Sequence, residues 1–271
     1  MGLFGANYES AGVGVSKNER EKQPFFKFWE IYFRHFWKLV GVNILFIIGC
    51  LPIVTIGLAA TGTTKVLRNI SQERPVFIFH DMVQSAKKNW KQALVVGLID
   101  VIFIIGFIVS VPSYNNMAKE NSMFYIPMFI CLSCMMVFVL MHFYIYILIS
   151  STNLTIRQVL KNSFLLSCIA LKTNLITLLI SLVVFLSTVL FFPYSTIFVL
   201  FFTFSFLGFL ICFNSYPVVR KYVINPYYEA RDEENPENKY MDSTEDAVFE
   251  DKGGSEAPIK AVKKTKGKRI S

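Results

Sequence analysis

Four long apolar stretches dominate the pattern of hydrophobic and polar positions, at residues 92–112, 124–150, 173–192 and 196–218. A helix that crosses a bilayer needs about 20 mostly apolar residues. In hydrocarbon the backbone must satisfy its own hydrogen bonds, which favours helices. The pattern therefore predicts an all-α, multi-pass helical membrane protein with four clear spans.

A fifth apolar segment, 39–58, is interrupted near its end by Pro52, which is followed by Thr55 and Gly57. Proline lacks a backbone N–H and breaks the preceding helical turn. We expect residues 36–51 to enter the membrane, a helix break from Pro52 to Gly57 buried among the spans, and a short return helix rich in small residues. The alternative is a simple fifth span with the N-terminus outside.

The positive charges give an orientation, since cytoplasmic loops are enriched in Lys and Arg. Residues 17–38 and 61–91 each carry six Lys or Arg, whereas 113–123 carries only Lys119 and 193–195 carries none. With a hairpin at 36–60, both N- and C-termini are cytoplasmic and only the two poorly charged connections, 113–123 and 193–195, lie outside.

Two connecting pieces have the spacing of amphipathic helices. Residues 25–38 place their charges on one narrow arc, which predicts an interfacial helix within an N-terminal segment 1–38. Residues 77–91 repeat that pattern before the next span. When the sequence is shifted by 81 residues, segment 77–112 aligns with segment 158–193. This alignment indicates either a weak internal repeat or an order of amphipathic helix, lysine and span that unrelated membrane proteins also share.

Composition supports a membrane body with a different tail. The chain is 54% hydrophobic and 17% charged, whereas soluble domains carry about 25% charged residues. Residues 1–228 have a charge of +10 and residues 229–271 a charge of −2. We therefore assign 39–225 to a helical membrane domain and 226–271 to a disordered, charged cytoplasmic tail. Because the Lys and Arg residues flank apolar spans, the expected partner is the lipid bilayer. We do not expect the protein to bind nucleic acid.

Asp100 and His142 are the candidate intramembrane polar pair. At 1.5 Å per residue both lie roughly 12 Å from the inner boundary of consecutive, antiparallel spans. Ionisable groups at such depth are costly and often functional. The alternative is that Asp100 reaches Lys87, Lys88 or water, and that His142 is merely hydrogen-bonded.

Other polar residues in the spans favour a structural reading. Asn43 and Asn214 are expected to bond between helices. Cys131 and Cys134 have CxxC spacing but lack a redox context, and are expected to be packing residues. No metal site, cofactor site or catalytic motif is recognisable, so we expect a protein that is not an enzyme.

Four short stretches resemble a known family. These are Met1-Gly2-Leu3-Phe4, Leu51-Pro52-Ile53-Val54-Thr55-Ile56-Gly57, Lys88-Asn89-Trp90-Lys91-Gln92 and the fainter Lys161-Asn162. Together they resemble the YesL-like bacterial membrane proteins, a family of unknown function. The resemblance covers about residues 1–225, and the long charged tail departs from it.

The resemblance implies a bacterial cell membrane location and a link to carbohydrate uptake systems. Two functions follow as hypotheses. One is a non-enzymatic accessory or regulatory subunit, attached to a sugar transporter complex. The other is a small transporter or channel that uses Asp100 and His142.

Overall fold

The computed structural model describes residues 23–235, which contain helices and no strand. The helices are α1 (Pro24–Arg34), α2 (Phe36–Cys50), η1 (Ile53–Thr55), α3 (Ile56–Ser71), α4 (Ile78–Lys88), α5 (Trp90–Glu120), η2 (Ser122–Phe124), α6 (Tyr125–Ser151), α7 (Ile156–Ile169), α8 (Leu171–Leu190), α9 (Thr196–Phe198), η3 (Val199–Thr203), α10 (Phe204–Val219), η4 (Arg220–Ile224) and α11 (Asn225–Glu229). Here η1 and η2 are 3₁₀ helices, whereas η3 and η4 are π-helical turns within one continuous helix.

The predicted fold class is confirmed. Within residues 23–235, four helical segments are long and apolar enough to cross a membrane: α5, the η2–α6 unit, α8 and the helix Thr196–Glu229. Helices α1 and α2 form a fifth apolar unit bent by 75°. The protein is therefore a multi-pass helical membrane protein, with four clear spans and a broken first segment.

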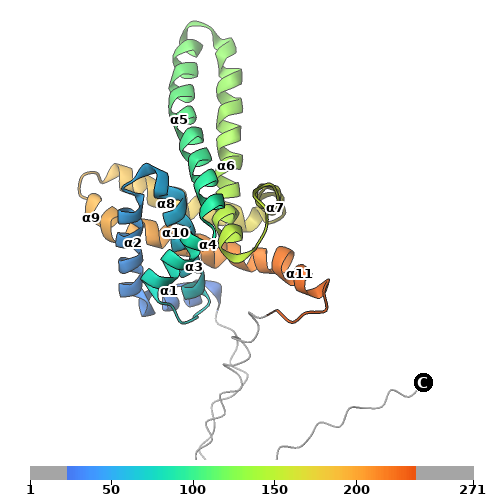
Figure 1. Cartoon of the computed structure of the whole chain (residues 1–271). Helices are drawn as coiled ribbons and strands as arrows, with labels where there is room; N and C mark the ends of the chain where they lie inside the picture. The colour runs from blue at the N-terminus through green and yellow to red at the C-terminus, as the bar shows by residue number, and fades with distance from the viewer. Residues whose placement is uncertain (1–22, 236–271) are drawn as a thin grey trace, which may run out of the picture. The chain divides into compact units, whose positions relative to one another are not determined.

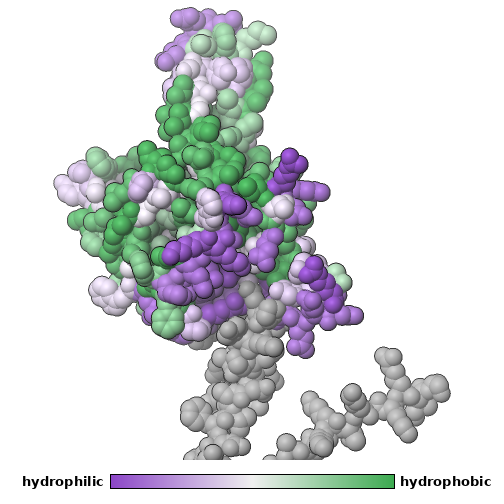
Figure 2. Space-filling model, in the orientation of Figure 1, coloured by the Kyte–Doolittle hydropathy of each residue, from purple (hydrophilic) through white to green (hydrophobic). Residues whose placement is uncertain are grey.

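The α5–α6 hairpin projects from a body made of the remaining helices (Figure 1). On the face shown in Figure 2, hydrophobic residues cover much of the upper body and the lower part of the hairpin, whereas hydrophilic residues gather at the hairpin tip, on the lower part of the body and at its right side. This apolar band between two polar ends is the surface that a bilayer requires.

The expectation of a loop at 113–123 is wrong, because α5 continues to Glu120. Pro112 lies inside this helix and does not end it. The proline removes the usual donor to the carbonyl of Ile108, and the hydroxyl of the next residue, Ser113, donates to the adjacent carbonyl, that of Val109, at 2.7 Å. The connection to α6 is therefore only Asn121 and the 3₁₀ turn.

Helix α3 is the central element of the body, where it packs against α2, α4, α5, α6 and α10. Its small residues allow close backbone approach, which is the main device of helix packing in membranes. At the crossing with α5, a Cβ added to Gly57 would lie 2.0 Å from the carbonyl oxygen of Ala93. A Cβ on Gly97 would lie 2.8 Å from the Gly57 backbone. Only glycine fits on both sides of this crossing.

The N-terminal amphipathic helix is shorter than the predicted 25–38 and packs partly into the body. It ends at Arg34, and the chain turns at His35. Its residues Phe28, Ile31 and Tyr32 are buried, whereas Phe25 is exposed. Aromatic rings of α10, from Phe206, Phe209 and Phe213, pack against Phe28. The helix thus anchors the start of α2 to the last span.

The two segments related by the 81-residue shift have the same local construction. In each, an amphipathic helix (α4, α7) ends at a single non-helical residue, and an apolar helix (α5, α8) begins immediately. The break residues are Asn89, with φ −111° and ψ 21°, and Ala170, with φ −98° and ψ 37°. His35, with φ −107° and ψ 16°, joins α1 to α2 in the same way. The unit occurs three times within residues 23–235.

The last helix is longer than the predicted span 196–218, because it continues through η4 and α11 to Glu229. It therefore passes the boundary expected at residue 225. Of the described residues, 23–233 belong to one compact unit. The motif Met1–Phe4, most of the N-terminal segment before α1 and the tail from residue 236 lie outside the described residues.

Candidate functional site: a buried Asp–His–Tyr network

Asp100 lies on the buried face of α5. Ala93, Val96 and Gly97 share this face at helical spacing, and they are all buried. Asp100 itself is 8% exposed. The close crossing at Gly57 and Gly97 lies one turn away, so the backbone around the carboxylate is held against α3.

The structure brings Asp100 and His142 together. The distance from His142 Nε2 to Asp100 Oδ1 is 2.8 Å. The other ring nitrogen, Nδ1, lies 2.8 Å from the carbonyl oxygen of Phe138. A carbonyl only accepts, so Nδ1 carries a proton. One further proton lies between Nε2 and the carboxylate, either as imidazolium with carboxylate or as neutral imidazole with carboxylic acid. In both forms the pair has no net charge, which reduces the cost of its burial.

Tyr146 is a third member of this network that the sequence analysis missed. Its hydroxyl donates to Asp100 Oδ2. Tyr146 is four residues after His142, and residues four apart lie on the same face of a helix. The spacing of four residues from His142 was therefore the sequence signal that could have identified Tyr146 as part of the network. With Tyr146 and His142 on its two oxygens, Asp100 has a partner on each side.

Aromatic rings lie between the network and the part of the hairpin nearer its tip. Phe103 of α5 stacks on Phe138 of α6 with centroids 3.9 Å apart, and Phe138 lies 4.1 Å from the His142 ring. The low polarity of this environment strengthens the hydrogen bonds of the network. The arrangement can hold one exchangeable proton between an acid and a base within the membrane. No ion pair between Asp100 and a lysine is present among residues 23–235, contrary to the alternative of a boundary residue.

The helix break occurs at Pro52, but it is not buried among the spans as expected. Helix α2 ends at Cys50, and Pro52 has an extended backbone, with φ −80° and ψ 124°. The side chains of Leu51 and Ile53 are 75% and 64% exposed. The Thr55 hydroxyl lies 2.7 Å from the Gly49 carbonyl and 2.8 Å from that of Pro52, so the polar backbone is satisfied locally. Because hydrogen bonds close the turn, its apolar side chains are free to face lipid.

Gly57 lies within α3 and not in the break itself. It is buried at the crossing with Gly97 described above. The break and the crossing are therefore separate features: Pro52 ends one helix, and Gly57 packs the next one.

The two intramembrane asparagines bond between helices, as predicted. Asn43 of α2 donates to the carbonyls of Val199 and Leu200, at 3.0 and 2.7 Å, and accepts from the backbone N–H of Ser205. Asn214 of α10 donates to the hydroxyl of Thr177 in α8 at 2.9 Å. Both tie the last span to the rest of the body.

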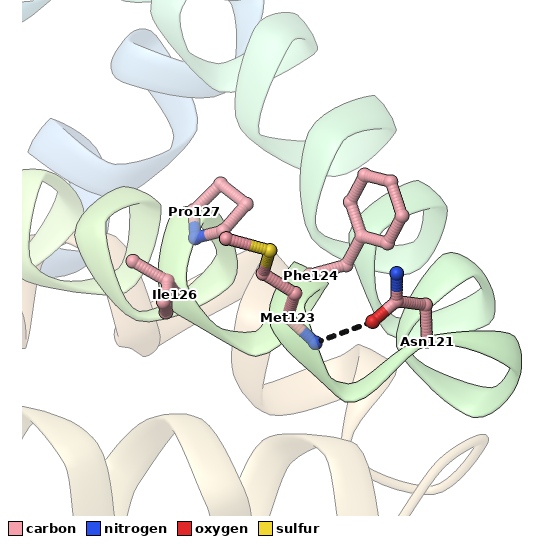
Figure 3. Close-up of a pocket in the computed structure, with 5 residues that line it drawn as sticks. All are labelled: Asn121, Met123, Phe124, Ile126 and Pro127. Atoms are coloured by element: carbon pink, nitrogen blue, oxygen red, sulfur yellow. Dashed lines mark hydrogen bonds between the residues drawn. The ribbon is translucent and has the colours of Figure 1, made fainter.

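Two open hollows occur away from the network. One, of about 270 Å³, lies at the hairpin tip beside Asn121 and Met123, where the Asn121 side chain accepts from the Met123 N–H (Figure 3). The other, of about 400 Å³, lies between α8 and the start of the last helix. Neither is lined by Asp100 or His142.

The thiols and the metal-binding residue types form no further cluster in the described region. The CxxC cysteines are unpaired; Cys131 is half-buried and Cys134 exposed, so the expectation that both are packed is wrong for Cys134. Within residues 23–235, no group of three or more His, Cys, Asp or Glu could hold a metal ion.

Comparison with known proteins finds a family match for one part of the chain. Residues 39–111 match the model of a family described as "Protein of unknown function, DUF624". The match covers most of α2, all of α3 and α4 and most of α5, and so includes the break at Pro52, the Gly57–Gly97 crossing and Asp100. His142 and Tyr146 lie beyond it. No curated protein and no solved structure matches the chain.

Proposed function

We propose that this protein is a non-enzymatic accessory or regulatory subunit of the bacterial cell membrane, related to the YesL-like proteins and linked to carbohydrate uptake. The match over residues 39–111 is compatible with that family, and the link to carbohydrate uptake comes from the family resemblance alone. The N- and C-termini are cytoplasmic in this proposal. The partners are the bilayer and a membrane component of a sugar transporter.

The observation that carries the proposal is the part of the α5–α6 hairpin that projects beyond the body. Ile102, Ile105 and Ile108 of α5 are 57–69% exposed, and Phe129 and Ile130 of α6 are 61% and 59% exposed. No helix of residues 23–235 covers these side chains. Helix association in membranes depends on van der Waals packing, and two apolar helices fixed in one hairpin offer a rigid surface for another membrane subunit.

A crosslinking experiment tests this proposal. A photoreactive amino acid replaces Ile105 on the hairpin, and in a matched control it replaces Val183, a similarly exposed residue of α8. The proposal expects the Ile105 position, and not Val183, to crosslink a sugar transporter subunit in native membranes. Deletion of the chain should then lower uptake of that sugar. Crosslinks to lipid alone from both positions would contradict it.

The buried network supports a second candidate function, a small transporter or channel that uses Asp100 and His142. A carboxylate and an imidazole that share a proton within the membrane are suited to proton-coupled transport. Flux through liposomes that contain only the purified chain would favour this function, provided that Asp100→Asn abolishes the flux. If liposomes that contain only the purified chain show no flux, and flux occurs only when its partner is also present, the result favours the accessory role.

A further inference from the structure

A second buried charge, unrelated to the Asp–His–Tyr network, lies on the central helix. Arg68 of α3 is only 6% exposed. Arginine remains protonated in proteins, so this residue cannot remove the cost of its burial by losing a proton. An isolated buried charge is expensive unless it is paired. The surroundings of Arg68 therefore have to supply a counter-charge or acceptors.

The protein itself supplies few of them. The guanidinium Nε and Nη1 atoms are fully buried and have no hydrogen-bond partner. Nη2 reaches only the Asn69 side-chain oxygen, at 3.4 Å, the outer limit of a hydrogen bond. None of the ion pairs within residues 23–235 involves Arg68. Nε and Nη1 therefore lack an acceptor among the described residues, and an acceptor from outside the chain would have to displace a neighbouring side chain to reach them.

The neighbouring groups make the local charge more positive. Lys65, one turn earlier on α3, is close enough to Arg68 and Lys88 to interact electrostatically with both, and Asp81 is the acid within the same range. The ring of Tyr216, in α10, lies 5.2 Å from the Arg68 guanidinium carbon. The ring orients the planar guanidinium by cation–π attraction but carries no net charge. The region thus has an excess of positive charge: Asp81 is the acid near Lys65, and no carboxylate forms an ion pair with Arg68 among residues 23–235.

We propose that Arg68 is the core of an oxyanion site for a phosphate group, with Lys65 as a second cation. The guanidinium fork matches the geometry of phosphate oxygens and forms two parallel hydrogen bonds with them. The same chemistry is offered by free inorganic phosphate and by the phosphate of an anionic lipid headgroup, which lies at the level of the Lys- and Arg-rich end of a membrane protein.

Entry to the site is through Asn69. This residue is half-buried, and its weak contact with Nη2 covers the edge of the guanidinium. The proposal requires the Asn69 amide to rotate away from Nη2, so that a phosphate oxygen can take its place beside the guanidinium, which lies over the Tyr216 ring. The proposal does not depend on the function proposed above, since it concerns other helix faces.

The test measures thermal unfolding of the full chain in a neutral detergent at fixed ionic strength. One arm replaces chloride by inorganic phosphate, and the other adds phosphatidylglycerol in place of phosphatidylcholine. The variants are Arg68→Met and, as a matched control, Arg157→Met at an exposed arginine of α7. We expect Tm of the wild type and of Arg157→Met to rise, and the rise to be lost in Arg68→Met. The affinity should fall about tenfold to a hundredfold when these charged hydrogen bonds are lost.

The two arms distinguish the sources. A rise with inorganic phosphate identifies a site for the free ion, and a rise with phosphatidylglycerol alone identifies a lipid headgroup site. No rise in either arm, or an equal rise in Arg68→Met, would overturn the proposal and leave water as the partner of Arg68. If Arg68→Met does not fold, Arg68→Lys is the deciding variant, because it keeps the positive charge but loses the two parallel donors of the guanidinium. We expect a smaller rise in Tm for Arg68→Lys than for the wild type. An unchanged rise in Tm would count against the site.

Discussion

The side-chain oxygen of Asn43 accepts a hydrogen bond from the backbone N–H of Ser205 at 2.8 Å and so joins α2 to α10 across 162 residues of sequence. The Asn43 amide nitrogen donates to two carbonyls of the π-helical turn η3 that precedes Ser205. A π-helical turn disturbs the regular i→i−4 bonding. Asn43, which has no exposed surface, therefore bonds the backbone of the last span where its helix is irregular.

Replacement of Asn43 by Leu should destabilise the protein strongly. The substitution removes three hydrogen bonds and leaves buried backbone groups unsatisfied, at about 1–3 kcal/mol for each group. Thermal unfolding in detergent should show a large drop in Tm. Asn115→Leu, at an exposed position near the hairpin tip, is the control and should change Tm little. Equal effects of the two substitutions would show that the η3 backbone is satisfied without Asn43.

The Asp100–His142 pair should behave as one energetic unit. Asp100→Asn and His142→Gln should each lower stability, and the double variant should lose less than the sum of the two. Groups in one hydrogen-bond network typically couple by about 0.5–3 kcal/mol. Thermal or denaturant unfolding of the four proteins measures that coupling. Additive losses would mean that the 2.8 Å contact contributes nothing beyond packing.

Loss of the Tyr146 hydroxyl should weaken the same network without changing its shape. Tyr146→Phe leaves Asp100 Oδ2 without its donor, and a hydrogen bond to a charged group contributes about 1.5–3 kcal/mol. Tyr194→Phe is the matched control, because Tyr194 is 82% exposed. We expect Tm to fall only in Tyr146→Phe, as measured in the same detergent. A larger effect at Tyr194 would contradict the network.

The Gly57–Gly97 crossing should reject a single methyl group. In Gly57→Ala the new Cβ would lie 2.0 Å from a backbone oxygen of α5, so the helices must move apart. Overpacking of this kind costs about 1–3 kcal/mol, and more where backbone has to shift. Gly106→Ala is the control: its Cβ would meet nothing within 4 Å, and alanine gains about 0.5–1 kcal/mol over glycine in a helix. The two variants should therefore shift Tm in opposite directions, and a fall in both would argue against the close crossing.

The distribution of positive charge predicts which polar end faces the cytoplasm. Cysteine introduced at Lys119, on the exposed hairpin tip, should react with a membrane-impermeant maleimide in intact cells. Cysteine at Lys88, at the exposed end of α4, should react only after permeabilisation. Both variants need Cys134 and Cys168 replaced first, because these native thiols are exposed. Labelling of position 88 in intact cells would reverse the orientation.

The sequence by itself determined the number and approximate position of the apolar helices, because hydrophobic length and composition decide what can cross a bilayer. It did not determine where α5 and the last helix end, since both continue beyond their apolar stretches. The sequence also determined the break at Pro52, where the ring removes a backbone donor. The pairing of Asp100 with His142 followed from equal depth on consecutive helices. The continuation of α5 past Pro112 was misjudged: the helix runs on to Glu120, although the proline removes the usual donor to the carbonyl of Ile108.

Only the tertiary structure decided which faces meet. The Gly57–Gly97 contact depends on how α3 crosses α5, and hydrophobic periodicity carries no information about crossing points. The exposure of the break at Pro52, the burial of Arg68 beside Tyr216 and the hydrogen bonds of Asn43 to η3 likewise depend on neighbours more than 100 residues away or on other helices. In a membrane protein nearly every span is apolar on all sides, so pattern alone does not distinguish a lipid-facing side from a packed one. Small and polar residues decide that difference, and they do so only in pairs that the folded chain brings together.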